Sequence, residues 1–89
     1  MDLVIDAAAH DAILRAVKEN HPNEACGVLL GSAGMVQAAI ETANVHPDPS
    51  RHFEIDPAAL VAAHRSARNG GPEVLGYYHS HPNGHARPS

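Results

Sequence analysis

A chain of 89 residues makes one small domain, which buries only about 60–65 % of the surface that it exposes when unfolded. Hydrophobic residues supply 44 % of the chain and aromatic residues 3 %, so we expect a light core of Ala, Val, Leu and Ile. The formal charge of −4, without a cluster of Lys or Arg, argues against nucleic-acid binding. Neither a signal peptide nor a membrane span is indicated, and the single cysteine, Cys26, suits a reducing cytoplasm.

The first part of the chain predicts a short strand followed by an amphipathic helix. Leu3-Val4-Ile5 is an apolar run, and Asp6 is a suitable N-cap for a helix over residues 7–20. His21-Pro22-Asn23 ends this helix. Its apolar residues recur at nearly helical spacing, at Ala9, Ile13, Leu14 and Val17.

The middle of the chain predicts a β-hairpin. Residues 24–31 form a run that is apolar after its first residue, and residues 32–34 have the composition of a turn. Residues 35–45 predict the returning strand. A loop over residues 46–50 and a short extended piece over residues 53–55 follow.

A second helix and a last strand complete the pattern. Asp56 is a suitable N-cap, Pro57 suits the first helical position, and residues 69–72 form a strong stop. The helix carries Leu60, Val61 and His64 on related faces, and a strand starts at Glu73. The order strand, helix, hairpin, helix, strand predicts one α/β domain over residues 1–89, with a mixed sheet flanked by helices.

The last strand leads into His79-Ser80-His81-Pro82. Because side chains alternate along a strand, we expect His79 and His81 on one face, roughly 6–7 Å apart along the backbone. Two such imidazoles can share one metal ion. Pro82 has no N–H to donate and ends the ladder, and Asn83-Gly84 signals a turn. Eight histidines favour metal chemistry, although ordinary surface or core histidines are the alternative.

The other candidates carry weaker signals. Glu24 is followed by no charged residue until Glu41, so its carboxylate lies at the entrance of a buried strand. It is either a general base or a solvated loop carboxylate, and spacing alone favours the latter. Cys26 lies in an apolar run, which predicts a buried, inert thiol. Ser89 alone carries no signal, and His85 is either a third ligand or a solvated loop residue. The remaining histidines share no spacing, and we expect surface or helix residues at His10, His46, His52 and His64.

Three segments together resemble the JAMM (MPN+, Mov34/PAD-1) zinc metallopeptidases, and most of all their compact bacterial members. These segments are Glu24-Ala25-Cys26-Gly27 after His21-Pro22, then residues 76–82, then Pro88-Ser89. The family pattern is a Glu, then His-X-His-Pro, then a Ser eight residues after the second His, the offset at which Ser89 stands from His81. The resemblance covers essentially the whole chain and implies the JAMM/MPN fold, a cytidine-deaminase-like α/β fold.

The resemblance also implies the chemistry. It implies zinc as the cofactor, His79 and His81 as its ligands, and Glu24 as the general base that holds and deprotonates the attacking water. Ser89 would donate a hydrogen bond to the oxyanion. The implied reaction is hydrolysis of a peptide or isopeptide bond in a protein or peptide substrate, after the C-terminal diglycine of ubiquitin or of a ubiquitin-like sulfur carrier.

The family's third ligand is an Asp three residues beyond the serine, and this sequence stops at Ser89. The family's last strands and helix also have no counterpart, so the implied fold is C-terminally incomplete. The alternatives to an active enzyme are a truncated remnant and a catalytically inactive MPN-like module, which pairs with another subunit or with itself through an exposed sheet edge. A zinc nucleoside deaminase would need His-X-Glu and Pro-Cys-X-X-Cys, which the sequence lacks.

Overall fold

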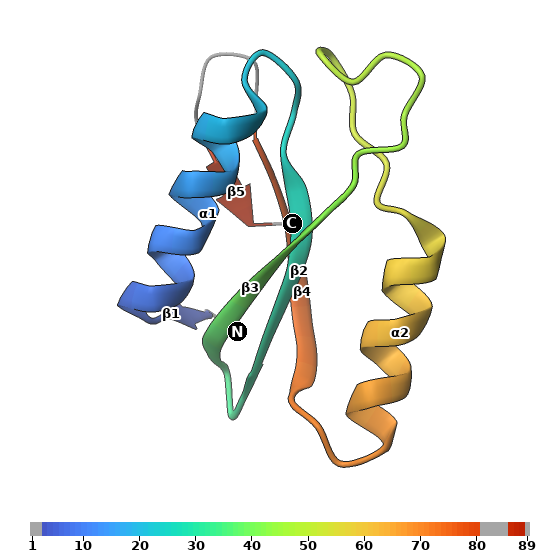
Figure 1. Cartoon of the computed structure of the whole chain (residues 1–89). Helices are drawn as coiled ribbons and strands as arrows, with labels where there is room; N and C mark the ends of the chain where they lie inside the picture. The colour runs from blue at the N-terminus through green and yellow to red at the C-terminus, as the bar shows by residue number, and fades with distance from the viewer. Residues whose placement is uncertain (1–2, 81–85, 89) are drawn as a thin grey trace.

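The computed structural model describes residues 3–80 and 86–88 and has a five-stranded sheet with a helix on each face. β1 runs parallel to β3, and the pairs β3–β2, β2–β4 and β4–β5 are antiparallel, so the predicted mixed sheet is confirmed. β5 was not predicted. The elements in chain order (Figure 1) are β1 (Val4–Ile5), α1 (Ala7–Asn20), β2 (Cys26–Ser32), β3 (Met35–Thr42), α2 (Pro57–Arg68), β4 (Glu73–Ser80) and β5 (Ala86–Pro88).

Both helices begin at the predicted caps. The Asp6 carboxylate accepts a hydrogen bond from the Ala9 N–H at 2.9 Å, and that of Asp56 accepts one from the Ala58 N–H at 3.0 Å. Each bond satisfies a backbone donor that has no partner within its helix. Among the described residues, neither helix is long and apolar enough to cross a membrane.

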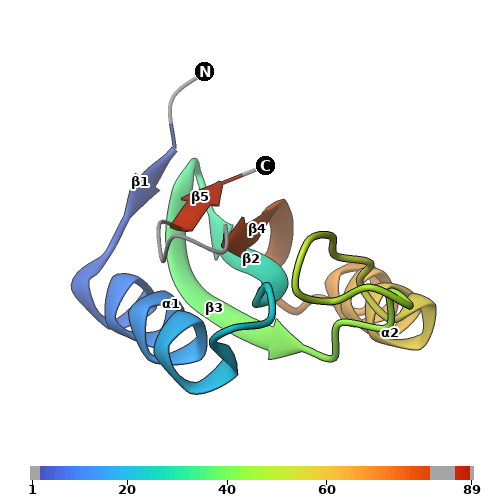
Figure 2. The same cartoon turned by 90° about the horizontal axis from the view of Figure 1, so that it is seen from above.

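α1 covers one face of the sheet and builds the hydrophobic core there (Figure 2). Leu14, one of the apolar residues at nearly helical spacing, is not part of this core, since its side chain is 50 % exposed. Consecutive helical residues lie about 100° apart, so Leu14 falls outside the stripe that contains Ile13. The small side chain of Ala16 takes the core position instead. Buried residues of α1 are Ala9, Ile13, Ala16 and Val17, and they pack with Leu29, Val36 and Tyr78 of the sheet.

α2 lies on the opposite face and packs much less tightly. None of its residues is buried, and Val61 is 54 % exposed. A groove of about 340 Å³ separates the helix from β2 and β3. Nε2 of His64 lies 3.2 Å from the hydroxyl of Tyr77, a polar contact between α2 and β4. This face of the sheet is therefore only partly covered, and the segment between β3 and α2 occupies its other end (Figure 1).

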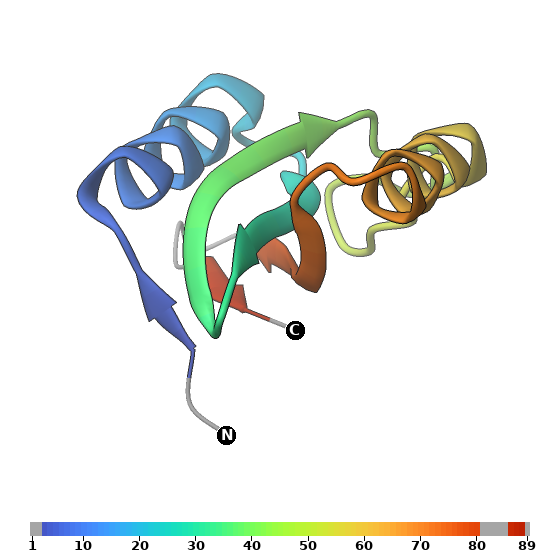
Figure 3. The same cartoon turned by 90° about the horizontal axis from the view of Figure 1, so that it is seen from below.

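The hairpin is tight and its strands are strongly twisted. Ala33 and Gly34 have φ angles of 53° and 79°, the left-handed pair that a two-residue hairpin turn needs. The register shifts at Leu29/Leu30 on the β4 side and at Leu30/Gly31 on the β3 side. Such bulges increase the local twist, and Figure 3 shows β3 curving around the sheet. Gly27 is required for close packing, because a Cβ there would collide with the Ile40 carbonyl and the Tyr78 ring.

Candidate functional site

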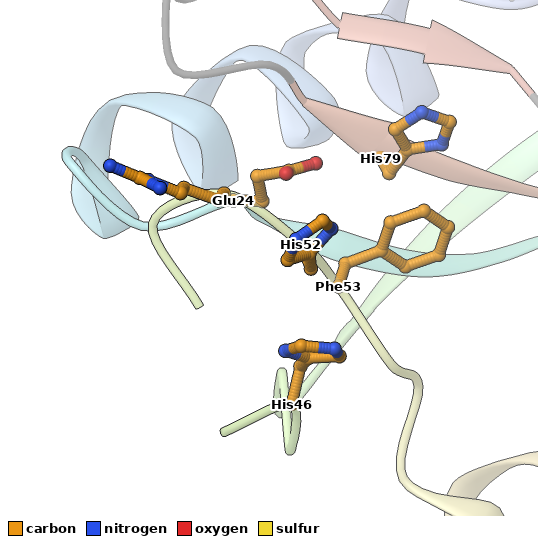
Figure 4. A pocket seen from close by; sticks show the side chains of 6 residues that line it. Glu24, His46, His52, Phe53 and His79 are labelled. Carbon is orange, nitrogen blue, oxygen red and sulfur yellow. The ribbon is translucent and has the colours of Figure 1, made fainter. Parts of the chain in front are cut away.

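The sheet register places Glu24 and His79 on one face. Cys26 stands opposite His79 across the β2–β4 ladder, and directly opposite residues share a face. Ala25 belongs to the core on the α1 side. Because successive side chains alternate, Glu24 and Cys26 point to the other face with His79. Figure 4 shows the Glu24 carboxylate extending toward the side of the pocket that holds His79.

Two hydrogen bonds hold these residues side by side. The Ala25 N–H donates to Ser80 Oγ at 2.8 Å, and the Ser80 N–H donates to the Ala25 carbonyl at 2.9 Å. Ala25 is 2 % exposed and Ser80 is 1 % exposed, so water does not compete for either bond. The middle residue of the His-Ser-His triplet thus joins the end of β4 to the backbone next to Glu24.

Glu24 lies in a pocket and is shielded from solvent. Its side chain is 4 % exposed, so the solvated loop carboxylate that spacing alone favours is wrong. The pocket has a volume of about 320 Å³. The segment after β3 returns over Glu24 and forms one wall, which the spacing of charges along the chain does not reveal. The pocket is lined by Glu24, His46, Arg51, His52, Phe53 and His79 (Figure 4).

Phe53 stacks on His79. The two ring centroids are 4.3 Å apart and the ring planes differ by 11° (Figure 4). A parallel neighbour at this distance limits rotation of the imidazole about its side-chain bonds. Phe53 therefore holds the His79 ring in a defined orientation within the pocket. The short extended piece predicted around Phe53 is confirmed only as an isolated bridge between Asn44 and Ile55.

Asn44 anchors the returning segment to the site. Its side-chain N–H groups donate to the carbonyls of Glu24 and His52, each at 3.0 Å, and to that of Pro49 at 3.4 Å. Its Oδ1 accepts from the N–H groups of His46 and Glu54, both at 3.1 Å. The Glu24 N–H in turn donates to the Pro49 carbonyl at 2.7 Å. One amide side chain thus fixes both ends of the pocket wall against the backbone of Glu24.

Two histidines that we expected at the surface also line the pocket, and other predictions stay open. His52 is exposed as expected and His46 is half-buried, and their ring centroids lie 4.9 Å apart. Their placement depends on the hydrogen bonds of Asn44. The sequence does not indicate this role, because an Asn after a strand is a common turn residue. His81, His85 and Ser89 lie outside the described residues. Within residues 3–80 and 86–88, no group of three His, Cys, Asp or Glu could hold a metal ion.

Cys26 is the buried thiol that its apolar neighbours predict, with no exposed surface. Its Sγ lies 3.6 Å from the Thr42 hydroxyl. Burial raises the pKa of the Cys26 thiol, because the thiolate would lose its hydration. A thiol that stays protonated is a poor nucleophile. Glu24 and His79, not Cys26, are therefore the groups suited to chemistry on this face.

Comparisons with known proteins bear on the same residues. Residues 6–89 match the family described as prokaryotic homologs of the JAB domain. A protein named desampylase, from Haloferax volcanii, is 37 % identical over 93 aligned positions, which cover 98 % of this chain and 67 % of that protein. A protein from Thermus thermophilus named probable TtuB-protein conjugate cleaving protease is 40 % identical over 68 positions, which cover 76 % of this chain and 45 % of that protein.

A solved structure supports the fold. The solution structure of protein DSY2949 from Desulfitobacterium hafniense matches with a TM-score of 0.77 and 30 % identity. The match covers 90 % of this chain and 57 % of that one. The present chain thus spans about two thirds of the Haloferax protein and less than half of the Thermus protein.

Proposed function

Because the chain belongs to the prokaryotic JAB family, the JAMM/MPN family that its motifs resemble, we propose that it is a zinc-dependent peptidase or isopeptidase. The substrate that we propose is a conjugate of a ubiquitin-like protein, cleaved after its C-terminal diglycine. The names of the Haloferax and Thermus relatives support this class of substrate. The observation that carries the proposal is the buried carboxylate of Glu24 in one pocket with His79.

The donor chemistry of the pocket fits zinc. An imidazole nitrogen is a preferred zinc ligand, and the ring of His79 is held in a defined orientation by Phe53. Ligands oriented by their neighbours bind a metal more tightly than freely rotating ones. We propose His79 and His81 as ligands. When bound, zinc supplies Lewis-acid activation of the attacking water and of the scissile carbonyl.

Glu24 performs the proton transfers in the proposed reaction. Its carboxylate accepts the proton of the attacking water and delivers it to the amine that leaves. The carboxylate is shielded from bulk water. Two hydrogen bonds fix the backbone of Glu24, one from its N–H to the Pro49 carbonyl and one from the Asn44 side chain to its carbonyl. Ser89, at the family's offset from His81, is the proposed hydrogen-bond donor to the oxyanion.

Glu24→Gln tests the proposed base, because glutamine keeps the shape of the side chain but does not accept the proton. A fusion of a ubiquitin-like protein through its diglycine to a fluorescent lysine peptide is incubated with the zinc-loaded chain. We expect the variant to bind zinc like the wild type and to cleave at least ~10²-fold more slowly. Glu19→Gln, on the exposed side of α1, is the control and should cleave at the wild-type rate. Equal cleavage by E24Q and E19Q would show that Glu24 is not the base.

A binding module without catalysis is the second candidate. The open groove beside α2 favours it, since Ile40 at its edge is 49 % exposed. An apolar surface of this kind is typical of a contact with another protein. A zinc-loaded chain that cleaves no diglycine conjugate but elutes as a dimer in size-exclusion chromatography would favour this candidate over the peptidase.

A further inference from the structure

Two sets of contacts connect Glu24 to His79, and the second of them runs through the segment after β3. The first is the pair of hydrogen bonds that joins the end of β4 to the residue after Glu24. The second begins at Asn44, whose side chain donates to the Glu24 carbonyl at 3.0 Å. It ends at Phe53, whose ring stacks on that of His79 with 4.3 Å between the centroids (Figure 4). The proposed base and the proposed ligand are thus connected twice.

Asn44 fixes the backbone on both sides of Phe53. Its side-chain N–H donates to the His52 carbonyl at 3.0 Å, and its Oδ1 accepts from the Glu54 N–H at 3.1 Å. The Glu54 carbonyl in turn accepts from the Val45 N–H at 2.9 Å. Both neighbours of Phe53 in the chain are therefore bound to the end of β3, and the backbone that carries the phenyl ring has a fixed position.

The stack restrains the imidazole of His79 without competing for its nitrogens. The two ring planes differ by 11°, so the phenyl ring covers a face of the imidazole. A histidine binds a metal through the lone pair of a ring nitrogen, which lies in the plane of the ring and points outward from its edge. A neighbour on the face therefore limits rotation of the ring and leaves ligation to the edge.

Phe53 has a second environment that offers a simpler explanation. It also lines an adjoining groove of about 300 Å³, whose apolar lining includes Ile55, Leu60 and Tyr77. As a wall of that groove, Phe53 would supply only hydrophobic contact, and another apolar residue of similar size would replace it. The parallel planes of Phe53 and His79 favour a more specific role, because hydrophobic contact alone does not require them.

We propose that Phe53 is a positioning residue of the zinc site: its ring, carried by the segment that Asn44 anchors, holds His79 in the orientation in which it binds the metal. The inference rests on the proposed function, because it takes His79 as a ligand. Removing a neighbour that orients a ligating histidine typically costs about 10–100-fold in metal affinity. Since Asn44 also bonds the Glu24 backbone, the same segment sets the ligand relative to the base.

The first test is zinc affinity, measured for the whole 89-residue chain by competition with a chromogenic chelator. Phe53→Leu keeps an apolar side chain but removes the flat face, and it should bind zinc at least ~10-fold more weakly. Phe53→Tyr keeps the face and should bind zinc like the wild type. The control is Ile55→Ala, which shortens an apolar side chain of the same segment outside the pocket of Glu24 and His79, and it should keep the wild-type affinity.

The second test needs no metal. In the metal-free wild type, the ring current of Phe53 should shift the carbon-bound imidazole protons of His79 upfield, and NMR relaxation should show an ordered ring. Both features should be lost in Phe53→Leu and kept in Phe53→Tyr and Ile55→Ala. Asn44→Ala should weaken both, and adding it to Phe53→Leu should change the His79 ring no further. His79→Gln assigns the signals, and circular dichroism confirms that each variant is folded.

Equal zinc affinity of F53L and the wild type would overturn the proposal, and so would an equal loss in F53L and I55A. Wild-type His79 protons without an upfield shift would show that the stack does not exist in solution. A chain that binds zinc equally well with and without the phenyl ring refutes the positioning role alone. A wild type that binds no zinc refutes the zinc-dependent function, and the metal-free spectra then decide alone whether Phe53 orders His79.

Discussion

Replacing Ser80 with alanine tests whether the bond to Ala25 holds the site together. Ser80 Oγ accepts the Ala25 N–H at 2.8 Å, and both residues are almost completely buried. The substitution removes one oxygen and leaves this N–H without a partner where water does not reach. A buried donor orphaned in this way costs about 1–3 kcal/mol. In a domain of this size, ~2 kcal/mol corresponds to a fall in Tm of roughly 8–16 °C.

The assay is urea unfolding followed by far-UV circular dichroism, with thermal unfolding alongside. Ser32→Ala, at the exposed end of β2, is the matched control and should change the unfolding free energy by less than ~0.5 kcal/mol. Hydrogen exchange at the Ala25 amide should also become faster in the Ser80 variant. If S80A and S32A unfolded at the same urea concentration, the Ala25–Ser80 bond would not be a clamp and our account of the site would be wrong.

Two further substitutions test the site wall and the core. Asn44→Asp replaces the amide that donates to three carbonyls with an acceptor. We expect the free energy of unfolding, measured with urea, to fall by about 2 kcal/mol or more. The control Asn23→Asp, in an exposed turn, should be nearly neutral. Tyr78→Phe removes a buried hydroxyl that has no hydrogen-bond partner among the described residues, so stability at pH 7 should rise, and a fall would contradict this reading. Burial raises the pKa of the Tyr78 phenol in the folded state. Above about pH 10 the phenol therefore ionises in the unfolded state but not in the folded state, and the free energy of unfolding of the wild type falls. Urea midpoints at pH 7 and 10.5 should show a smaller alkaline loss in Tyr78→Phe.

Elements set by local sequence were predictable. Asp6 and Asp56 begin helices because a carboxylate can reach backbone donors two or three residues on, a purely local geometry. The alternation along β4 needs only the pleat of a strand. Leu14 is among the apolar residues of the helix pattern, but its angle around the helix axis places it outside the stripe in which the smaller Ala16 lies. Hydrophobicity alone therefore does not decide which helix residues enter the core.

The candidate site was predictable only in part. His79 was a candidate ligand from the strand that leads into His-Ser-His, whereas the role of Glu24 came only from the family resemblance, since neither the spacing nor the composition showed that Glu24 is buried. The wall with His46, Arg51 and His52 was missed because it has no periodicity. Its position depends on Asn44 contacting backbone groups up to 20 residues away, and such contacts exist only after the strands have paired. Local sequence patterns therefore do not predict these long-range contacts.

The long span of the Ala25–Ser80 bond has a consequence for biosynthesis. These residues are 55 positions apart, and a ribosome that adds about 5–20 residues per second needs roughly 3–11 s to pass from one to the other. Throughout that interval β2 and β3 can form their hairpin, but β4 is not yet available to bring His79 to Glu24. A nascent chain therefore emerges without the pocket that joins Glu24 to His79, and the hydrolytic centre that we propose there can form only after β4 has been inserted.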